Sequence, residues 1–273
     1  AAEPVTLTEE AAGQIARAYA AWLAEHCGKP MAELKVAVGR DSRLSGPSLQ
    51  RAVLTGLVAM GATAADCGMA STPAMFMATV LPGCDFDGAV MITASHLPQN
   101  RNGLKFFTNE GGLESADIKE ILRRAAEGPA AARLHGRLTA FDILTPYTAM
   151  LRQRIITEVQ DGDRPLTGLK IAVDAGNGAG GFYATRVLAP LGADVSASVY
   201  LEPDGSFPNH VPNPENQEAM ESIRRAVLTG GCDLGLIFDT DVDRAGAVEA
   251  DGTELGRNRL IALAAAIAAW QTP

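Results

Sequence analysis

The chain carries two copies of one α/β pattern, and this repeat restricts the possible folds more than any other feature. Two apolar segments of similar sequence, LKVAV at 34–38 and LKIAV at 169–173, each lead into a glycine-containing turn. A second pair follows, at 84–95 (CDFDGAVMITAS) and 232–243 (CDLGLIFDTDVD), in which an apolar strand pattern ends in a polar cluster. Each copy is far longer than the roughly 20–50 residues of a solenoid repeat, so we expect two related domains.

Alternation of strand and helix patterns predicts an α/β fold with two similar, doubly wound, three-layer αβα domains and mixed, mostly parallel sheets. Helical patterns follow the first strand of each copy, at 47–60 and 182–191. We expect the first domain over residues 1–145 and the second over 146–256. The terminal helix pattern, from about Asn258, is nearly all apolar and needs cover, so residues 257–273 are expected to begin a truncated third domain.

Residues 145–159 have helical spacing of apolar side chains and are expected to connect the two domains. Thr145 is the expected N-cap, and Pro146 suits the first turn. The boundary between the domains therefore falls close to this helix.

Composition and charge exclude some classes of function. The 273 residues include 47% hydrophobic ones and carry a formal charge of -9, which argues against binding nucleic acid by bulk attraction. The longest apolar run, 260–270, is shorter than the roughly 20 residues that span a membrane. The four cysteines are scattered and are expected to be buried thiols in a reducing compartment. We therefore expect a soluble intracellular protein.

An acidic cluster follows the apolar strand pattern of the second copy. Asp239, Asp241 and Asp243 alternate along the chain, so in an extended backbone they face the same way. Three adjacent carboxylates repel one another unless a cation is present, and three oxygen ligands suit Mg2+. The sequence therefore predicts a magnesium site here.

Other interpretations of this cluster remain open. An EF-hand loop is rejected because Arg244 and Ala250 stand where that loop needs glycine and glutamate. A haloacid-dehalogenase-type phosphatase would use Asp239 as its phosphorylated nucleophile and Asp241 as acid and base, although that motif normally opens its domain. A solvated acidic loop is the simplest alternative.

The matching position of the first copy carries Ser95 and His96, and Lys105 follows a Pro, Asn and Gly loop. A serine in such a loop is usually a turn residue, and His96 adds little if the two side chains alternate along a strand. No G-x-S-x-G elbow surrounds Ser95, which argues against an acyl hydrolase. Because ligands gather at the carboxyl ends of strands, the serine and the acidic cluster can face one cleft.

Three stretches together resemble one family. TASHLPQNRNGLK resembles the phosphoserine loop of the α-D-phosphohexomutases, the phosphoglucomutase and phosphomannomutase superfamily, and DTDVDR resembles its metal loop. VGRDSRLSG, at 38–46, resembles its V-G-x-D-x-R-x-S stretch. Leu97 stands where the family usually has Asn, and Thr240 where it usually has Gly. With these two residues, the stretches resemble a divergent subgroup of the family that occurs in plants, algae and some bacteria.

The resemblance implies a mutase that interconverts hexose 1-phosphates and 6-phosphates, with glucose the first choice and mannose the second. Ser95 would carry the phosphoryl group, and glucose 1,6-bisphosphate would be the intermediate and activator. Arg40 and Arg244 would balance charge near the phosphoserine, while His96 and Lys105 would transfer protons or contact phosphate. The implied ligands of Mg2+ are Ser95, Asp239, Asp241 and Asp243.

The resemblance covers only the first two of the four domains of that family. Domains 3 and 4, which recognise the sugar phosphate, are therefore expected elsewhere in the same polypeptide, and this portion alone is expected to be inactive. The cytoplasm or the plastid stroma is the expected compartment. A non-catalytic sugar-phosphate-binding protein on the same scaffold is a further alternative. The loops at 202–214 and 174–181 are interpreted as a proline-rich connection and a tight strand-to-helix turn.

Overall fold

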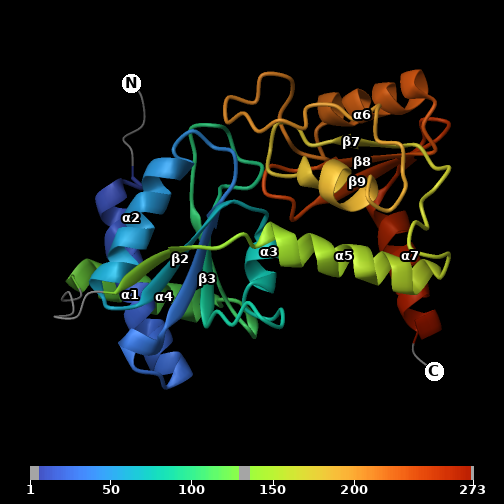
Figure 1. Cartoon of the computed structure of the whole chain (residues 1–273). Helices are drawn as coiled ribbons and strands as arrows, with labels where there is room; N and C mark the ends of the chain where they lie inside the picture. Colours follow the sequence, from blue (N-terminus) through green and yellow to red (C-terminus); the bar gives the residue numbers. More distant parts are fainter. Residues whose placement is uncertain (1–5, 129–135, 272–273) are drawn as a thin grey trace, which may run out of the picture. The chain divides into compact units, whose positions relative to one another are not determined.

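The computed structural model describes residues 6–128 and 136–271 (Figure 1). The chain divides into two compact units, Ala1–Tyr147 and Thr148–Pro273. We call these unit 1 and unit 2. Each unit combines a mixed sheet with helices, so the expected α/β class is confirmed.

Unit 1 is built on a six-stranded sheet in the order β5-β4-β3-β1-β2-β6. β1 pairs in parallel with β2 and β3, β2 pairs in parallel with β6, and β4 runs antiparallel to β3 and β5. Its elements are α1 (Glu9–Cys27), a 3-10 helix (Met31–Glu33), β1 (Lys35–Arg40), α2 (Gly46–Ala59), β2 (Thr63–Met69), α3 (Thr72–Met77), β3 (Gly88–Ile92), β4 (Leu104–Thr108), β5 (Gly111–Gly112), α4 (Ser115–Glu127) and β6 (Arg137–Ala140).

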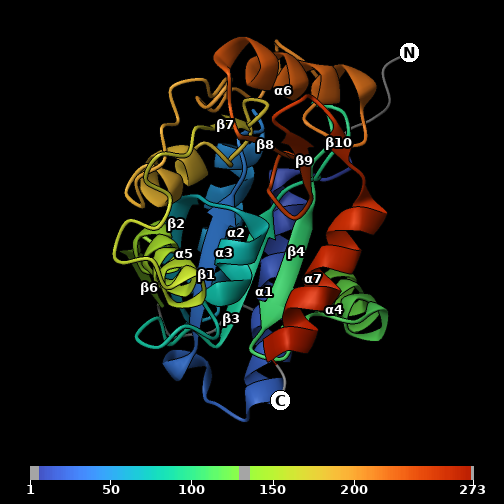
Figure 2. The same cartoon turned by 90° about the vertical axis from the view of Figure 1, so that its right-hand side faces the viewer.

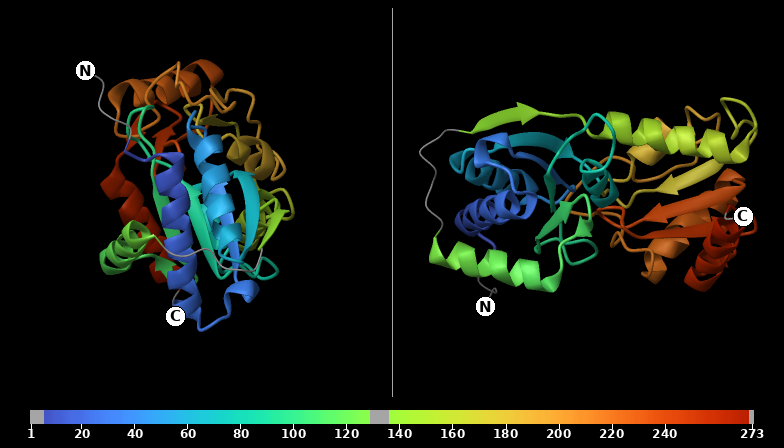
Figure 3. Two further views of the ribbon diagram at one scale, coloured as in Figure 1. Left: turned by 90° about the vertical axis from the view of Figure 1, so that its left-hand side faces the viewer. Right: turned by 90° about the horizontal axis from the view of Figure 1, so that it is seen from below.

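The sheet of unit 1 is covered on both faces. α1 and α2 lie side by side on one face (Figure 3), and α3 packs against β1, β3 and β4 (Figure 2). α1 and α2 approach so closely at Gly56 that a Cβ there would lie only 2.5 Å from the carbonyl oxygen of Gly13. Glycine, which has no side chain, permits this approach. All five residues of β3 are buried, so this strand passes through the core. The segment between β3 and β4, residues 93–103, contains Ser95, and we call it the Ser95 loop.

Unit 2 is built on a four-stranded sheet in the order β10-β9-β8-β7. β7 and β8 are parallel, whereas β9 runs antiparallel to β8 and β10, and α6 packs over β7, β8 and β9 (Figure 1). Its elements are α5 (Leu144–Val159), whose first turn belongs to unit 1, β7 (Ile171–Asp174), a π-helix (Tyr183–Leu188), α6 (Gln217–Gly230), β8 (Leu234–Phe238), β9 (Ala245–Glu249), β10 (Glu254–Leu255) and α7 (Arg257–Gln271).

The strand pairing follows the repeat in the sequence. In unit 1 the first strand of the copy, β1, pairs in parallel with β3, and an antiparallel strand, β4, follows. In unit 2, β7 pairs in parallel with β8, and an antiparallel strand, β9, follows. The segment between β8 and β9, residues 239–244, contains the three aspartates, and we call it the acidic loop. The Ser95 loop and the acidic loop therefore follow equivalent strands, β3 and β8, at the same end of each strand.

Two local expectations differ from the structure. The helix expected over 182–191 is a π-helix and covers only Tyr183–Leu188. Thr145 is not the N-cap of α5, because the helix already begins at Leu144. The carboxylate of Asp142 instead accepts the backbone N–H of Thr145 at 3.3 Å and its hydroxyl at 2.6 Å.

Apolar side chains remain exposed on α7, where Ile261 is 60% exposed and Leu263 is 55% exposed. None of the helices in the described segments is both long enough and apolar enough to cross a membrane. The four cysteines are free thiols; Cys67, Cys84 and Cys232 are buried as expected, but Cys27 on α1 is only half-buried.

Candidate functional site

Ser95 occupies a turn that begins immediately beyond the buried strand β3. The N–H of Leu97 donates to the carbonyl of Ala94 at 3.0 Å, which closes the turn, and the N–H of Ser95 donates to Thr93 Oγ1 at 2.8 Å. Ser95 has a φ of 51°, whereas His96 does not have a positive φ. A positive φ at only the first central position is typical of a type II′ turn, where glycine is preferred. The backbone therefore holds Ser95 in a left-handed conformation that costs a side chain roughly 1–2 kcal/mol.

His96 lies beside Ser95 rather than on the opposite side. Ser95 Oγ and His96 Nδ1 are 3.4 Å apart. The expectation that the two side chains alternate was wrong, because β3 ends at Ile92 and Ser95 already belongs to the turn. A serine hydroxyl and an imidazole are thus neighbours on an exposed loop.

Arg40 and Lys105 lie on the two strands that flank β3. Arg40 ends β1 opposite Ile92, and Lys105 on β4 lies opposite Met91. Nη1 of Arg40 donates to the backbone carbonyl of Asp41 at 3.1 Å. Both cations therefore lie on strands next to the one that leads into the Ser95 loop.

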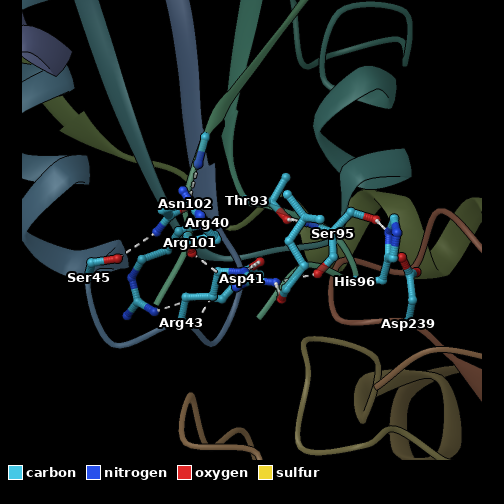
Figure 4. A network of polar contacts seen from close by, with 12 residues as sticks. Arg40, Asp41, Arg43, Ser45, Thr93, Ser95, His96, Arg101, Asn102 and Asp239 are labelled. Atoms are coloured by element: carbon cyan, nitrogen blue, oxygen red, sulfur yellow. Dashed lines mark hydrogen bonds and ion pairs between the residues drawn. The ribbon is translucent and has the colours of Figure 1, made fainter. Parts of the chain in front are cut away.

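Arg43, which the sequence reasoning did not single out, is a central residue of this loop. Its side chain is fully buried and donates to backbone carbonyls of the loop, including those of Leu97 at 2.7 Å and Pro98 at 2.8 Å. Figure 4 shows Arg43 together with Asp41 and Ser95. The only signal in the sequence was its place in the stretch 38–46, two residues after Asp41.

The acidic loop of unit 2 brings its three predicted ligands together. Carboxylate oxygens of Asp239, Asp241 and Asp243 lie within 4.8 Å of one another. Asp239 and Asp241 are fully buried, whereas Asp243 is exposed. The loop turns sharply at Val242, whose φ of 66° is rare for a β-branched residue. A tight backbone turn therefore gathers side chains that alternation along a strand would have kept apart.

Arg244 lies against this acidic cluster. Its Nε and Nη2 donate to Asp239 Oδ2 at 3.1 and 2.9 Å, its backbone N–H donates to Asp239 Oδ1 at 3.1 Å, and its Nε is 3.7 Å from Asp243. One guanidinium offsets one of the three negative charges. Three carboxylate oxygens this close together suit a hard divalent cation such as Mg2+.

The turn after β7 contacts the backbone of the acidic loop. The N–H of Ala179 donates to the carbonyl of Thr240 at 2.8 Å, and a Cβ on Gly178 would lie 2.7 Å from that oxygen. This contact is consistent with the interpretation of 174–181 as a tight turn. Thr240 is fully buried, and its Oγ1 finds no hydrogen-bond partner among the described residues.

A buried ion pair anchors the loop at 202–214, which the sequence had indicated only as a connection. His210 Nε2 lies 3.0 Å from both carboxylate oxygens of Asp174, and its Nδ1 lies 3.1 Å from the carbonyl of Val211. Both ring nitrogens thus face acceptors, so both must donate and the imidazole is protonated. Burial alone lowers the pKa of His210, but the hydrogen bond and charge of Asp174 outweigh it, and the pKa is raised.

This loop also reaches the acidic cluster. Asn213 Oδ1 accepts a hydrogen bond from Arg244 Nη1 at 3.4 Å. A chain of contacts therefore runs from the His210–Asp174 pair through the loop to Arg244, and from Arg244 to Asp239.

The fold and the two loops define a class of α/β proteins that carry one polar loop at the same strand end of each repeated unit. Residues 1–131 match the family description "Phosphoglucomutase/phosphomannomutase, alpha/beta/alpha domain I", and residues 145–252 match its "alpha/beta/alpha domain II". The chain belongs to the phosphoglucomutase/phosphomannomutase family.

Individual relatives agree with this assignment. The chain is 38% identical to the phosphoglucomutase of Neisseria gonorrhoeae over 94% of its own length and 53% of that protein. It is 37% identical to the phosphomannomutase/phosphoglucomutase of Pseudomonas aeruginosa strain PAO1, over 94% of the chain and 52% of that protein. A solved phosphoglucomutase/phosphomannomutase family protein from Burkholderia thailandensis superposes with a TM-score of 0.82 at 29% identity, over 98% of this chain and 57% of that one. The chain thus spans about half the length of the relatives it matches.

Proposed function

We propose that the protein interconverts hexose 1-phosphates and hexose 6-phosphates through a phosphoryl group carried on Ser95. The observation that carries the proposal is the acidic cluster, whose three carboxylates gather within 4.8 Å at the end of β8. The equivalent strand of the other unit, β3, leads to Ser95. Glucose is proposed as the preferred sugar and mannose as the second, because every relative named above is a phosphoglucomutase by name and only some are also phosphomannomutases.

The proposed reaction moves the phosphoryl group twice. In the first step the bond between phosphorus and Ser95 Oγ breaks, a bond forms to a hydroxyl oxygen of the sugar phosphate, and the proton of that hydroxyl passes to Ser95 Oγ by way of His96. The resulting bisphosphorylated sugar, glucose 1,6-bisphosphate for a glucose substrate, then turns and returns its other phosphoryl group to Ser95 Oγ. His96 Nδ1 lies 3.4 Å from Ser95 Oγ, and we assign it the hydroxyl proton of Ser95 when that bond forms; the proton then passes to the sugar oxygen that has lost its phosphoryl group. Arg40 and Lys105 offset negative charge on the phosphoryl group.

We assign Mg2+ to Asp239, Asp241 and Asp243, with an oxygen of phosphorylated Ser95 as a further ligand. When bound, the ion polarises the phosphorus–oxygen bond and offsets charge in the transition state. Arg244 keeps Asp239 oriented through three hydrogen bonds.

The two units would form the first part of a longer enzyme. Residues 1–145 and 146–256 would act as the first two domains, and 257–273 would open the third. The third and fourth domains would supply sugar recognition and further phosphate contacts. Activity is therefore expected of the complete polypeptide and not of these two units alone.

Two substitutions separate this proposal from its alternatives in the complete polypeptide. Ser95→Ala is expected to abolish conversion of glucose 1-phosphate to glucose 6-phosphate while the protein remains folded. A phosphatase of the haloacid-dehalogenase type would keep releasing inorganic phosphate after Ser95→Ala and lose that activity after Asp239→Asn. A non-catalytic binding protein would bind sugar phosphate with no turnover in the unsubstituted protein.

A further inference from the structure

The guanidinium of Arg43 uses every N–H it has. Its side chain and that of Asp41 are both 0% exposed, and Arg43 Nε donates to Asp41 Oδ2 at 3.3 Å. A guanidinium has five N–H donors in one plane, so four remain on the two terminal nitrogens. All four are directed at backbone carbonyls.

Those carbonyls belong to one segment, residues 95–101. Nη1 of Arg43 donates to Pro98 at 2.8 Å and to Arg101 at 3.0 Å. Nη2 donates to Leu97 at 2.7 Å and also to the carbonyl of Ser95 itself (Figure 4). The side chain of one residue therefore organises the backbone of the whole Ser95 loop.

Asp41 ties this arrangement to the sheet. Its Oδ1 accepts the backbone N–H of Arg43 at 3.0 Å, and its own N–H donates to the carbonyl of Ile92, the last residue of β3, at 3.1 Å. The anchor of Arg43 is thus fixed to the strand from which the Ser95 loop departs. Charge-assisted hydrogen bonds of this kind are stronger than neutral ones.

The loop needs such an anchor. Ser95 is held in a left-handed conformation that a free chain would leave, and the side chain of Leu97 is 49% exposed, so apolar burial does little to fix this segment. Because the carbonyl of Ser95 points at Arg43, the N–H of His96 in the same trans peptide points away from Arg43. The orientation of this peptide, next to Ser95 Oγ, follows from the position of the guanidinium.

We propose that Arg43, held by Asp41, is a positioning residue that fixes the backbone of residues 95–101 and so places Ser95 Oγ for phosphoryl transfer. The catalytic consequence of this inference rests on the proposed function. The hydrogen bonds from Arg43 to the backbone of residues 95–101, which we call the Arg43 clamp, do not depend on that function.

Replacing Arg43 by lysine separates the effect of the positive charge from the effect of the planar arrangement of donors. A lysine keeps the positive charge but has three donors on one atom, so it cannot satisfy four carbonyls spread across a planar fork. Carbonyls of the loop would lose their donors, and the segment would leave its present backbone conformation. R43K therefore tests the clamp without removing the cation.

The experiment compares R43K with L57A in the complete polypeptide. Leu57 is a fully buried core residue of α2 in the same unit, so L57A lowers stability without removing any hydrogen bond to the Ser95 loop. Both variants are assayed at temperatures where at least nine-tenths of each is folded, and amide hydrogen exchange is measured without substrate. For R43K we expect a loss in kcat of roughly 10²-fold, the scale of a misplacement of about 1 Å, with KM nearly unchanged. We also expect faster exchange confined to residues 94–102.

L57A is expected to keep kcat near that of the unsubstituted protein and to speed exchange across the core of unit 1. If R43K and L57A lose kcat equally, or if exchange in R43K rises throughout unit 1, the inference is overturned. D41N serves if R43K does not fold, and it is expected to give the same local exchange pattern with a smaller loss of kcat.

Failure of the proposed function would leave a different signature. An unsubstituted protein without mutase turnover would contradict the proposed function, and the exchange measurement alone would then decide on the clamp. Local acceleration at 94–102 in R43K would support it, and unchanged exchange there would overturn it.

Discussion

At the scale of single residues, Ser95 combines chemical reactivity with an unfavourable backbone conformation. Its φ of 51° at the first central position of a turn closed by Ala94 and Leu97 is one that glycine adopts without cost. A serine is kept there although it destabilises the turn. Residues held in rare conformations gather at functional sites, which agrees with a role for the hydroxyl.

This conformation predicts different effects for two substitutions that both delete the hydroxyl. Ser95→Gly should have a free energy of unfolding about 1 kcal/mol higher than Ser95→Ala, because only the alanine retains a Cβ in the left-handed region. Urea denaturation of the two variants measures the difference. An alanine variant as stable as the glycine variant would contradict the strain inferred at Ser95.

A second prediction at this scale concerns Asp241, which is fully buried beside two other carboxylates. Asp241→Asn should weaken the response of the protein's stability to Mg2+, because it removes one of the three carboxylates that would hold the ion. At a Mg2+ concentration of about 100 Kd the unsubstituted protein should gain roughly 2.7 kcal/mol, and the variant should gain little. Thermal unfolding with and without Mg2+ measures both effects.

Glu221→Gln is the matched control, because Glu221 is an exposed acid on α6 of the same unit. It should respond to Mg2+ as the unsubstituted protein does. An equal response of Asp241→Asn and Glu221→Gln would show that Mg2+ acts on the surface charge in general and not at the acidic loop.

At the scale of elements, the loop at 202–214 connects distant parts of unit 2. His210 fixes one part of the loop to Asp174 at the end of β7, and Ser222 on α6 donates to the same carboxylate at 2.7 Å. Farther along the loop, Asn213 contacts Arg244 of the acidic loop. The buried pair therefore stabilises an element that in turn contacts the predicted metal site.

The raised pKa of His210 predicts a pH dependence of stability. The protonated imidazole stabilises the folded state fully below its unfolded-state pKa of about 6.5, and this contribution is lost as pH rises through the higher folded-state pKa. The free energy of unfolding of the unsubstituted protein, minus that of His210→Gln, should therefore fall as pH rises above about 6.5. Urea denaturation over a pH series tests this, and a difference that grew with pH would contradict the assignment of a protonated His210.

The elements that could be predicted from the sequence are those whose signal is local. Buried strands such as β3 and β8 show as apolar runs, and the polar clusters that follow them, which include Ser95 and Asp239, can be found from their position after the run. Arg43 and His210 could not be found in this way, because their partners lie far along the chain: Arg43 contacts Pro98, and His210 contacts Asp174. The short distance between the side chains of Ser95 and His96 could not be predicted either, because the alternation of apolar residues does not show where a strand ends and a turn begins.

At the scale of the whole molecule, two units repeat one strand arrangement, and each carries a polar loop where its second parallel strand ends. The proposed function requires the phosphoryl group of Ser95 and the Mg2+ of the acidic loop to belong to one site. Their binding free energies must then be coupled, and the coupling must be reciprocal.

This coupling predicts a change in metal affinity on phosphorylation. The protein phosphorylated on Ser95 should bind Mg2+ at least roughly fivefold more tightly than Ser95→Ala, which cannot be phosphorylated. Titration calorimetry of the two forms gives both dissociation constants. Equal constants would mean that the phosphoserine contributes no ligand to the metal.

The most direct test of phosphoryl transfer through Ser95 is to locate the phosphoryl group itself. The complete polypeptide is incubated with glucose 1,6-bisphosphate and Mg2+, digested, and mapped by mass spectrometry, with Ser95→Ala as the control. Phosphoryl transfer through Ser95 predicts one added phosphate on the peptide that contains Ser95 and none on that peptide in the control. A phosphate on Asp239, or no phosphate on Ser95 in a protein that turns over hexose phosphate, would contradict it.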